Sequence, residues 1–435
     1  MNDIALVPPP VPPPPVPPPP LPAPAPPPIP SQIGATAYFT GRMRAFRKII
    51  LRGALLQLVT FGIYRFWLTT DARRFLWTNT EIGGDSLEYA GTAMELFLGF
   101  LMAIALLVPV YVMLFIGSLE LGVWSQLSSA GAFVFLAVFG QYAYYRARRY
   151  RLTRTVFRGI RFHQSGSPFS YALRSLFWGA VTALSAGLAL PWAQASLERY
   201  KLAHTHYGEW QGEFAGSGTR LFARGIALWL ILIVAVVAAA VVGSKFVDSS
   251  ALARIATPAG AKDPKVGIEV LKLMGLGSGV MVIAGAVYMI LQAIVMRWWI
   301  EGLRFGPLVI ATTLRKRQIL GSYLRCFGYA LLLMFALSFI MGMTIGIVAA
   351  AVKVKPPDDV AQLLVVGSSM VVYLIMAIGI WVLYQMTIKL RIWRLAVDSI
   401  SLAGFEAIES VRADASQPSS AVGEGLADAL GAGGI

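Results

Sequence analysis

Residues 94–116, MELFLGFLMAIALLVPVYVMLFI, decide the class of this protein. The stretch has one charged residue, Glu95, and it lies at the beginning. Crossing a bilayer as a helix takes roughly 20 consecutive apolar residues, so this stretch is long enough to span one. Similar apolar blocks occupy about residues 46–67, 94–116, 128–145, 171–192, 221–243, 275–296, 323–351 and 361–388. The sequence therefore predicts an all-α membrane protein, a polytopic helical bundle.

The composition agrees with a membrane location. Hydrophobic residues make up 57% of the chain and charged residues 14%, whereas soluble domains carry about a quarter charged residues. The formal net charge of +15 would suggest nucleic-acid binding in a soluble protein. Here the basic residues lie between the apolar blocks, as in cytoplasmic loops that face anionic lipid. We therefore expect membrane lipids with anionic headgroups as partners, and no nucleic acid.

The distribution of arginine indicates how many blocks cross the membrane. If all eight crossed, segment 146–170 would face outward, and segment 117–127, which has no Lys or Arg, would face the cytoplasm. Segment 146–170 holds Arg146, Arg148, Arg149, Arg151, Arg154, Arg158 and Arg161. Both conflicts with the positive-inside bias disappear if blocks 46–67 and 171–192 do not cross. We expect six spans plus these two re-entrant or interfacial helical elements; eight spans is the alternative.

The two ends of the chain differ from the part between them. Within residues 1–37, the run 8–30 is mostly proline, which favours extended polyproline II and packs no core. We expect a disordered cytoplasmic arm, and the alternative is a ligand for an SH3-like or WW-like protein partner. Residues 412–435, rich in Ala, Gly, Ser and Asp, predict a disordered tail. Residues 38–411 are then the polytopic domain, with both termini cytoplasmic.

An internal repeat is visible at a shift of 125 residues (187 − 62, 192 − 67). The matched pairs are Gly62 with Gly187, Trp67 with Trp192, Arg74 with Arg199, Asn79 with His204, Gly83 with Gly208, Tyr89 with Phe214, and Gly91 with Gly216. One shift that matches so many positions of similar chemistry indicates a duplication, a common plan of membrane transport folds. We expect repeat 1 over about 46–145, repeat 2 over about 171–296, and a C-terminal helix pair over about 323–388.

The segment after each repeated Trp recurs more widely in the chain. A basic residue is followed by a polar stretch, a glycine, a large apolar residue and another glycine. Further copies cover 149–166 and 302–305, with a degenerate one at 399–405. Alternation around a glycine is typical of short β-hairpins. We expect small cytoplasmic hairpins against the inner face of the bundle; irregular amphipathic loops are the alternative.

One motif resembles a known family. It consists of residues 60–67 (TFGIYRFW), followed by Asp71, Arg73, Arg74, Phe75, Thr78, Asn79, Thr80 and Gly91. These residues resemble the signature of the YjgN-like family, which comprises uncharacterised multipass bacterial inner-membrane proteins. The resemblance covers about residues 38–405; in the second copy Pro191 precedes the Trp and His204 replaces the Asn. It implies a bacterial inner-membrane location and supplies no established activity.

Few residues are suited to catalysis or to holding a cofactor. The chain has one Cys and three His residues, and it lacks a nucleotide-binding motif. His204 and His206 lie two residues apart but have no Cys or acidic partner at ligand spacing. We therefore expect no catalytic residue, no cofactor and no metal site.

Two G-x-x-x-G pairs occur in apolar blocks, Gly275 with Gly279 and Gly342 with Gly346. Such pairs let helix backbones approach closely. We expect them to pack helices within the bundle; contact between subunits is the alternative.

Arginine is the residue type in excess. Its guanidinium suits bidentate contacts to phosphate, and the expected topology gathers several arginines at the cytoplasmic face. The candidate contacts to an anion or lipid headgroup are Arg73, Arg74, Arg149, Arg154, Arg199, Arg297 and Arg304. The alternative is that these arginines only determine the topology.

Two functions stay open at this point. The first is a transport or channel-like protein whose repeated re-entrant elements line a path. The second is a non-transporting membrane protein that organises anionic lipids or partner proteins through its arginine-rich cytoplasmic face. An enzyme that acts on a lipid comes third, because no catalytic set is recognisable.

Overall fold

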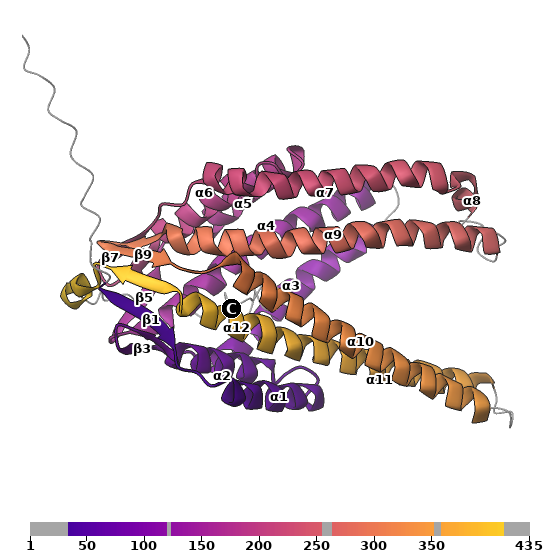
Figure 1. Cartoon of the computed structure of the whole chain (residues 1–435), viewed down its shortest axis with the longest axis horizontal. Coiled ribbons are helices and arrows are strands. Elements are labelled where there is room, and N and C mark those ends of the chain that lie inside the picture. Colours follow the sequence, from indigo (N-terminus) through magenta and orange to yellow (C-terminus); the bar gives the residue numbers. More distant parts are fainter. Residues whose placement is uncertain (1–33, 120–122, 255–262, 352–357, 413–435) are drawn as a thin grey trace, which may run out of the picture.

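The computed structural model describes residues 34–119, 123–254, 263–351 and 358–412. Its short strands lie together at one end, and helices extend from them in pairs (Figure 1). The first 33 residues of the proline-rich arm and residues 413–435 of the expected tail lie outside the described residues. Residues 35–37, which we assigned to the arm, belong to the first strand.

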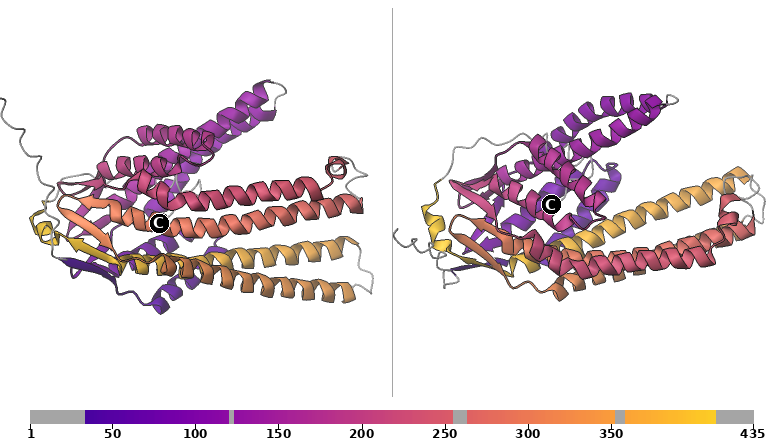
Figure 2. Two further views of the ribbon diagram at one scale, coloured as in Figure 1. Left: turned by 45° about the horizontal axis from the view of Figure 1, so that its top comes forward. Right: turned by 90° about the horizontal axis from the view of Figure 1, so that it is seen from above.

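Six helices are long and apolar enough to cross a membrane. They form three pairs: α3 (Ala93–Leu119) with α4 (Val123–Thr153), α7 (Gly218–Phe246) with α9 (Pro264–Gly302), and α10 (Lys316–Ala351) with α11 (Asp358–Tyr384). The α3–α4 pair diverges from the other two pairs (Figure 2). A short helix, α8 (Ser249–Ala253), follows α7.

The outward faces of these helices are apolar. Met113 and Phe133, for example, are 76% and 75% exposed. Apolar surface on this scale requires hydrocarbon rather than water as its surroundings, and helices satisfy their own backbone hydrogen bonds there. The chain is therefore a multi-pass membrane protein, and the expectation of six candidate spans is confirmed.

Each of the two remaining apolar blocks covers most of one short helix and the first residues of a second. The first pair is α1 (Met43–Val59) with α2 (Arg65–Thr78), and the second is α5 (Pro168–Leu184) with α6 (Leu190–Ala203). α1 and α5 have 17 residues each, and α2 and α6 have 14. A helix of this size is about 25 Å long or shorter, which is less than the roughly 30 Å hydrocarbon core. Both pairs lie close to the strands (Figure 1).

The two short pairs turn in the same way. Phe61 and Ala186 have φ angles of 50° and 49°, and the glycine after each has φ of 90°. The N–H of that glycine donates at 2.7 Å to the carbonyl oxygen five residues earlier, of Gln57 or Thr182. A positive φ of this size is cheap only for glycine, so the glycine in mid-block is what lets the chain turn back.

The ten strands form one closed antiparallel barrel. They are β1 (Ala35–Phe39), β2 (Thr80–Ile82), β3 (Asp85–Tyr89), β4 (Thr155–Phe157), β5 (Ile160–Gln164), β6 (Thr205–Tyr207), β7 (Trp210–Phe214), β8 (Leu303–Phe305), β9 (Leu308–Thr312) and β10 (Ile400–Ala403). A helical segment separates each two-stranded hairpin from the next, and β10 closes the barrel on β1. The expected hairpins are present, but the all-α class needs correction because they join edge to edge into one barrel.

The inside of the barrel is filled by side chains. Ala35, Phe157, Tyr207, Leu308 and Leu402 come from five strands around the barrel and are buried in one hydrophobic cluster. After β10, the 3-10 helix η4 (Phe405–Ser410) adds Phe405 and Ile408 to this cluster. The barrel is therefore a packed core and not a pore.

The G-x-x-x-G pairs do not pack helices within the bundle. A Cβ atom placed on Gly275, Gly279, Gly342 or Gly346 would have no atom of the described residues within 4 Å. That prediction is wrong, because the faces that carry these glycines point away from the neighbouring helices. Contact between subunits stays a prediction.

Candidate functional site

A cavity of about 830 Å³ lies where the helices meet the barrel. Its walls come from α1 and α2, from the strand-proximal ends of α9 and α10, and from the segment that continues α11. The charged residues that line it are Arg65, Arg73 and Lys389. Among the residues that the structure describes, no Asp or Glu lines it. We call it the basic cavity.

Helix α2 presents one polar stripe to the basic cavity. Arg65, Thr69 and Arg73 line it and recur every four residues, so they lie on one face of the helix. Arg73 is 1% exposed, and its Nη1 donates to the Tyr89 hydroxyl at 3.1 Å. The Arg65 guanidinium lies 4.5 Å from the centre of the Phe100 ring. Aromatic contacts thus hold both guanidinium groups at the cavity wall.

The opposite wall contains a π-helical turn. Helix α11 continues through η3 (Gln385–Lys389) into α12 (Leu390–Val397), and both Gln385 and Lys389 line the cavity. Gln385 is 8% exposed, and its Oε1 has no hydrogen-bond partner within the described part of the chain. Lys389 and Arg73 thus line the same cavity from opposite walls. π-helical turns occur frequently at functional sites, and this one carries a lysine side chain and an unpaired acceptor.

Three tryptophans, Trp299, Trp381 and Trp393, complete the cavity wall. Trp393 stacks on Trp77 with ring centres 5.0 Å apart, and its Nε1 donates to Thr80 Oγ1 at 3.0 Å. Tryptophan combines an apolar ring with one polar atom, which suits the headgroup level of a membrane. Cations beside indole rings can hold an anion that carries an apolar tail.

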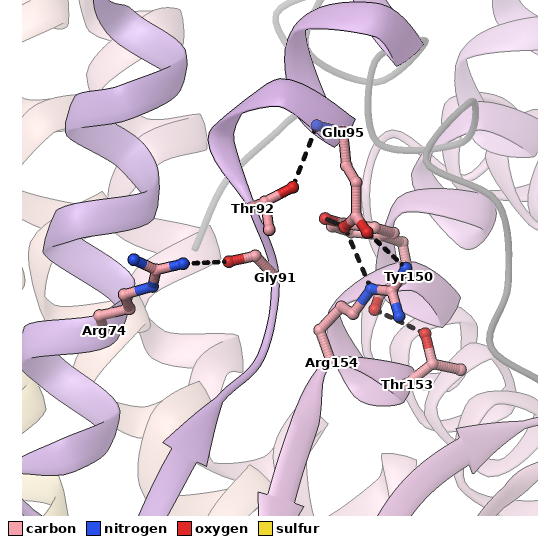
Figure 3. Close-up of polar contacts among 7 residues, drawn as sticks. All are labelled: Arg74, Gly91, Thr92, Glu95, Tyr150, Thr153 and Arg154. Carbon is pink, nitrogen blue, oxygen red and sulfur yellow. Dashed lines mark hydrogen bonds and ion pairs between the residues drawn. The ribbon is translucent and has the colours of Figure 1, made fainter.

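The other candidate arginines mostly make structural contacts. In three of them a guanidinium nitrogen donates to the carbonyl oxygen of the glycine 17 residues later; the pairs are Arg74 with Gly91, Arg149 with Gly166, and Arg199 with Gly216. The distance is 3.0 Å for the first pair (Figure 3) and 3.3 Å for the third. Each contact ties a helix to the segment that follows the next β-hairpin.

Arg154 is held by a carboxylate. Its Nη2 lies 2.8 Å from Glu95 Oε1 and its Nε donates to Oε2 at 3.2 Å, while the Tyr150 hydroxyl donates to Oε2 at 2.6 Å (Figure 3). A two-point guanidinium–carboxylate contact is geometrically specific. It fixes the first turn of α3 to the end of α4.

The last two candidate arginines lie outside the basic cavity. Arg297 Nε is 2.6 Å from Glu301 Oε1 on the same helix. Arg304 is exposed on β8, opposite Glu213 of β7. Of the seven predicted arginines, Arg73 is therefore the one that lines the cavity.

Most of the amino-acid sequence matches one family model. Residues 35–429 match the model described as a bacterial protein of unknown function, DUF898. The chain belongs to the DUF898 family. The match extends over the barrel and all described helices of this DUF898 protein. The family is described only as one of unknown function, so the resemblance to the YjgN-like family stays a prediction. Neither the curated proteins nor the solved structures contain a match to the chain.

The repeat signature of the DUF898 protein has structural roles. Gly62 and Gly187 form the turns described above. Asn79 Nδ2 donates to Phe75 O, and His204 Nδ1 contacts Tyr200 O, in each case at 2.7 Å and at the C-cap of its helix. The His therefore replaces the Asn without loss of the contact.

Both signature tryptophans pack on aromatic rings. Trp67 lies 6.0 Å from the Phe97 ring, and Trp192 lies 4.9 Å from the Phe222 ring. The other His of the pair singled out above, His206, stacks on His163 with ring centres 4.6 Å apart. The described residues contain no group of three side chains that could hold a metal ion.

Two cavity cations of the DUF898 protein were missing from the sequence-based candidates. Arg65 lies within the motif TFGIYRFW, where its charge in an apolar block was a visible signal. Lys389 lies at the end of the last apolar block, next to further basic residues such as Arg391 and Arg394. Its position resembles an ordinary cytoplasmic flank, so the sequence gives little reason to single it out.

Proposed function

We propose that this DUF898 protein is a bacterial inner-membrane protein that binds an anionic phospholipid headgroup in the basic cavity. The observation that carries the proposal is the convergence of Arg65, Arg73 and Lys389 on one cavity walled by tryptophan. In this role the protein organises anionic lipid and does not transport it.

The distribution of charge supports an orientation with the barrel and both termini in the cytoplasm. The arginine-rich segment 146–161 covers the end of α4 and the hairpin β4–β5, at the barrel end of the molecule. Positive charge favours the cytoplasmic side, and the cytoplasmic leaflet carries the anionic lipids. The basic cavity then lies at the level of the inner-leaflet headgroups.

The cavity chemistry suits a phosphate with an apolar tail. A guanidinium can donate two parallel hydrogen bonds to phosphate oxygens, and the side-chain nitrogen of Lys389 adds a further hydrogen-bond donor. Arg73 is almost completely buried, where charge interactions are screened less than at the surface. The tryptophan rings offer apolar surface to the glycerol and acyl parts.

Lipid binding by the purified protein tests the proposal. Short-chain phosphatidylglycerol and phosphatidylcholine would be titrated into the detergent-solubilised full chain and followed by calorimetry. We expect tighter binding of the anionic lipid and about tenfold weaker binding in K389Q and R73Q, since each loses a charged contact. R161Q is the control, because Arg161 is exposed on β5. A K389Q or R73Q protein that binds phosphatidylglycerol as tightly as R161Q does would contradict the proposal.

Transport is the second candidate function. It is favoured by the two short helical pairs, because α1–α2 lines the basic cavity and α5–α6 lines a second cavity. A path would run between helices, since the barrel interior is packed. Uptake of a panel of small anions into proteoliposomes tests it. Flux that falls in R73Q would support transport, and no flux for any anion would count against it.

We also propose that the two short pairs arose by duplication. Equal helix lengths, equal turn angles and equivalent arginine–glycine contacts support this origin. Further family sequences in which the 125-residue correspondence is lost would contradict it.

A further inference from the structure

A second cavity, of about 600 Å³, lies between α4, α5 and α6. Its polar lining residues are Gln141 and Tyr144 of α4, Tyr171 of α5, and Gln194, Glu198 and Lys201 of α6. It contains one residue of each charge, whereas three cations line the basic cavity. We call it the paired-charge cavity.

Both charges of this cavity are held in place. Lys201 is 6% exposed, and its Nζ lies 2.5 Å from Glu198 Oε1 and 5.5 Å from the centre of the Tyr144 ring. The second carboxylate oxygen of Glu198 accepts a hydrogen bond from Trp299 Nε1 at 3.0 Å. Burial raises the pKa of the Tyr171 phenol, so this hydroxyl remains protonated and able to donate. The cavity wall thus offers fixed partners for a cation and for an anion.

The two cavities occupy corresponding places in the two short helical pairs. At the 125-residue shift, Thr69 and Arg73 of α2 correspond to Gln194 and Glu198 of α6 (194 − 69, 198 − 73). The first two line the basic cavity, and the second two line the paired-charge cavity. The same helix face therefore forms both cavities, with a carboxylate in place of the guanidinium.

We infer that the paired-charge cavity binds a zwitterionic phospholipid headgroup, which carries a phosphate and an ammonium. The ammonium contacts Glu198, and the phosphate contacts Lys201. Binding of this headgroup replaces the ion pair between Lys201 and Glu198 by two ion pairs, each between one of these residues and the ligand. No buried charge therefore loses its partner. The tyrosine rings favour the cation, and the two glutamine amides supply donors and acceptors for the remaining headgroup oxygens.

The charge of the lining also excludes the wrong headgroup. An anionic lipid would bring one net negative charge into a cavity whose own charges cancel. Its phosphate would pair with Lys201 and leave the Glu198 carboxylate buried without a compensating cation, which is unfavourable. Selectivity for the zwitterion therefore comes from the carboxylate of Glu198 in α6, at the position that corresponds to Arg73 in α2.

Crossed variants test this inference separately from the proposed function. Native mass spectrometry of the full chain in detergent would measure binding of short-chain phosphatidylethanolamine and phosphatidylglycerol. In E198Q we expect about tenfold weaker binding of phosphatidylethanolamine and unchanged binding of phosphatidylglycerol. R73Q should show the reverse pattern. E213Q, which alters an exposed carboxylate on β7, is the control.

A second variant covers the case in which E198Q does not fold because Lys201 loses its partner. The double variant E198Q/K201M removes both charges together and is expected to lose phosphatidylethanolamine binding while it keeps phosphatidylglycerol binding. Retention of phosphatidylethanolamine affinity in the folded single or double variant would overturn the inference. That result would leave the basic cavity untouched, since R73Q reports on it independently.

Discussion

The indole N–H of Trp299 donates to Oε2 of Glu198 at 3.0 Å and so joins α9 to α6. Trp299 lines the basic cavity, and Glu198 lines the paired-charge cavity. This hydrogen bond is therefore part of the wall that the two cavities share. Trp299→Phe removes the donor and keeps an aromatic ring, and it should lower the free energy of unfolding by roughly 1–3 kcal/mol, because a charged acceptor loses a partner.

Thermal unfolding in detergent measures this effect. Trp192→Phe is the matched control, because Trp192 is 36% exposed and packs on Phe222. A shift of the same size in both variants would mean that the Trp299–Glu198 bond contributes nothing beyond ring packing.

Glu95→Gln should destabilise the protein through the contact of α3 with α4. The variant replaces a carboxylate that binds Arg154 at two points and accepts from Tyr150 (Figure 3). A cost of roughly 1–3 kcal/mol is expected, because the guanidinium then lies partly buried without its anion. Asp85→Asn breaks the more exposed pair with Arg158 and should cost about 0–1 kcal/mol. Equal losses in the two variants would contradict this ranking.

Gly62→Ala should strain the turn between α1 and α2. The φ of Gly62 is 90°, and a Cβ atom there would touch no described residue, so the cost comes from the backbone conformation alone. We expect a loss of about 1–2 kcal/mol, since residues with a Cβ atom are disfavoured in left-handed conformations. Gly179→Ala within α5 also meets open space and should stabilise by about 0.5–1 kcal/mol. Changes of the same sign in both variants would argue against the described turn.

The topology predicts which positions an impermeant thiol reagent reaches in intact cells. With Cys326 replaced, a cysteine at Gln126, at the far end of the α3–α4 pair, should be labelled from outside. A cysteine at Thr78, at the end of α2 beside the barrel, should be labelled only after the cells are permeabilised. Labelling of the Thr78 position in intact cells would reverse the assigned orientation or add a span.

The spans and the turns were predictable from sequence because their signals are local. A run of apolar residues that is long enough to cross the hydrocarbon core identifies a candidate span. The bias of arginine toward the cytoplasmic side then indicates which apolar blocks cross the membrane. The break at Gly62 is visible because a glycine in mid-block permits the required φ. These features depend on a few neighbouring residues and on the bilayer.

The barrel could not be predicted from the sequence, because its closure depends on contacts between distant segments. Alternation around a glycine predicts each hairpin. The outer edges of a hairpin, however, pair with strands that are separated from it in the chain by a pair of helices. Ala35 pairs with Leu402, for example. Periodicity contains no information about which hairpins become neighbours, so separate hairpins and a closed barrel predict the same local pattern.

The candidate site was only partly predictable for a related reason. Arg73 and Arg74 are adjacent and chemically identical, yet Arg73 lines the basic cavity and Arg74 binds Gly91 O. Successive residues point about 100° apart around a helix, so the face that each presents depends on how α2 packs. The sequence shows where the basic residues are, but tertiary packing determines which of them line a cavity that could bind a ligand.

Closure of the barrel depends on a strand that is synthesised late. Strand β1 leaves the ribosome before any span, whereas its partner β10 follows the last one. The first strand must therefore wait, with one edge unpaired, until every span has been inserted. A chain that is cut short before residue 400 keeps two open strand edges, which are templates for aggregation. Because the first strand pairs with the last, the barrel can close only after β10 has been synthesised.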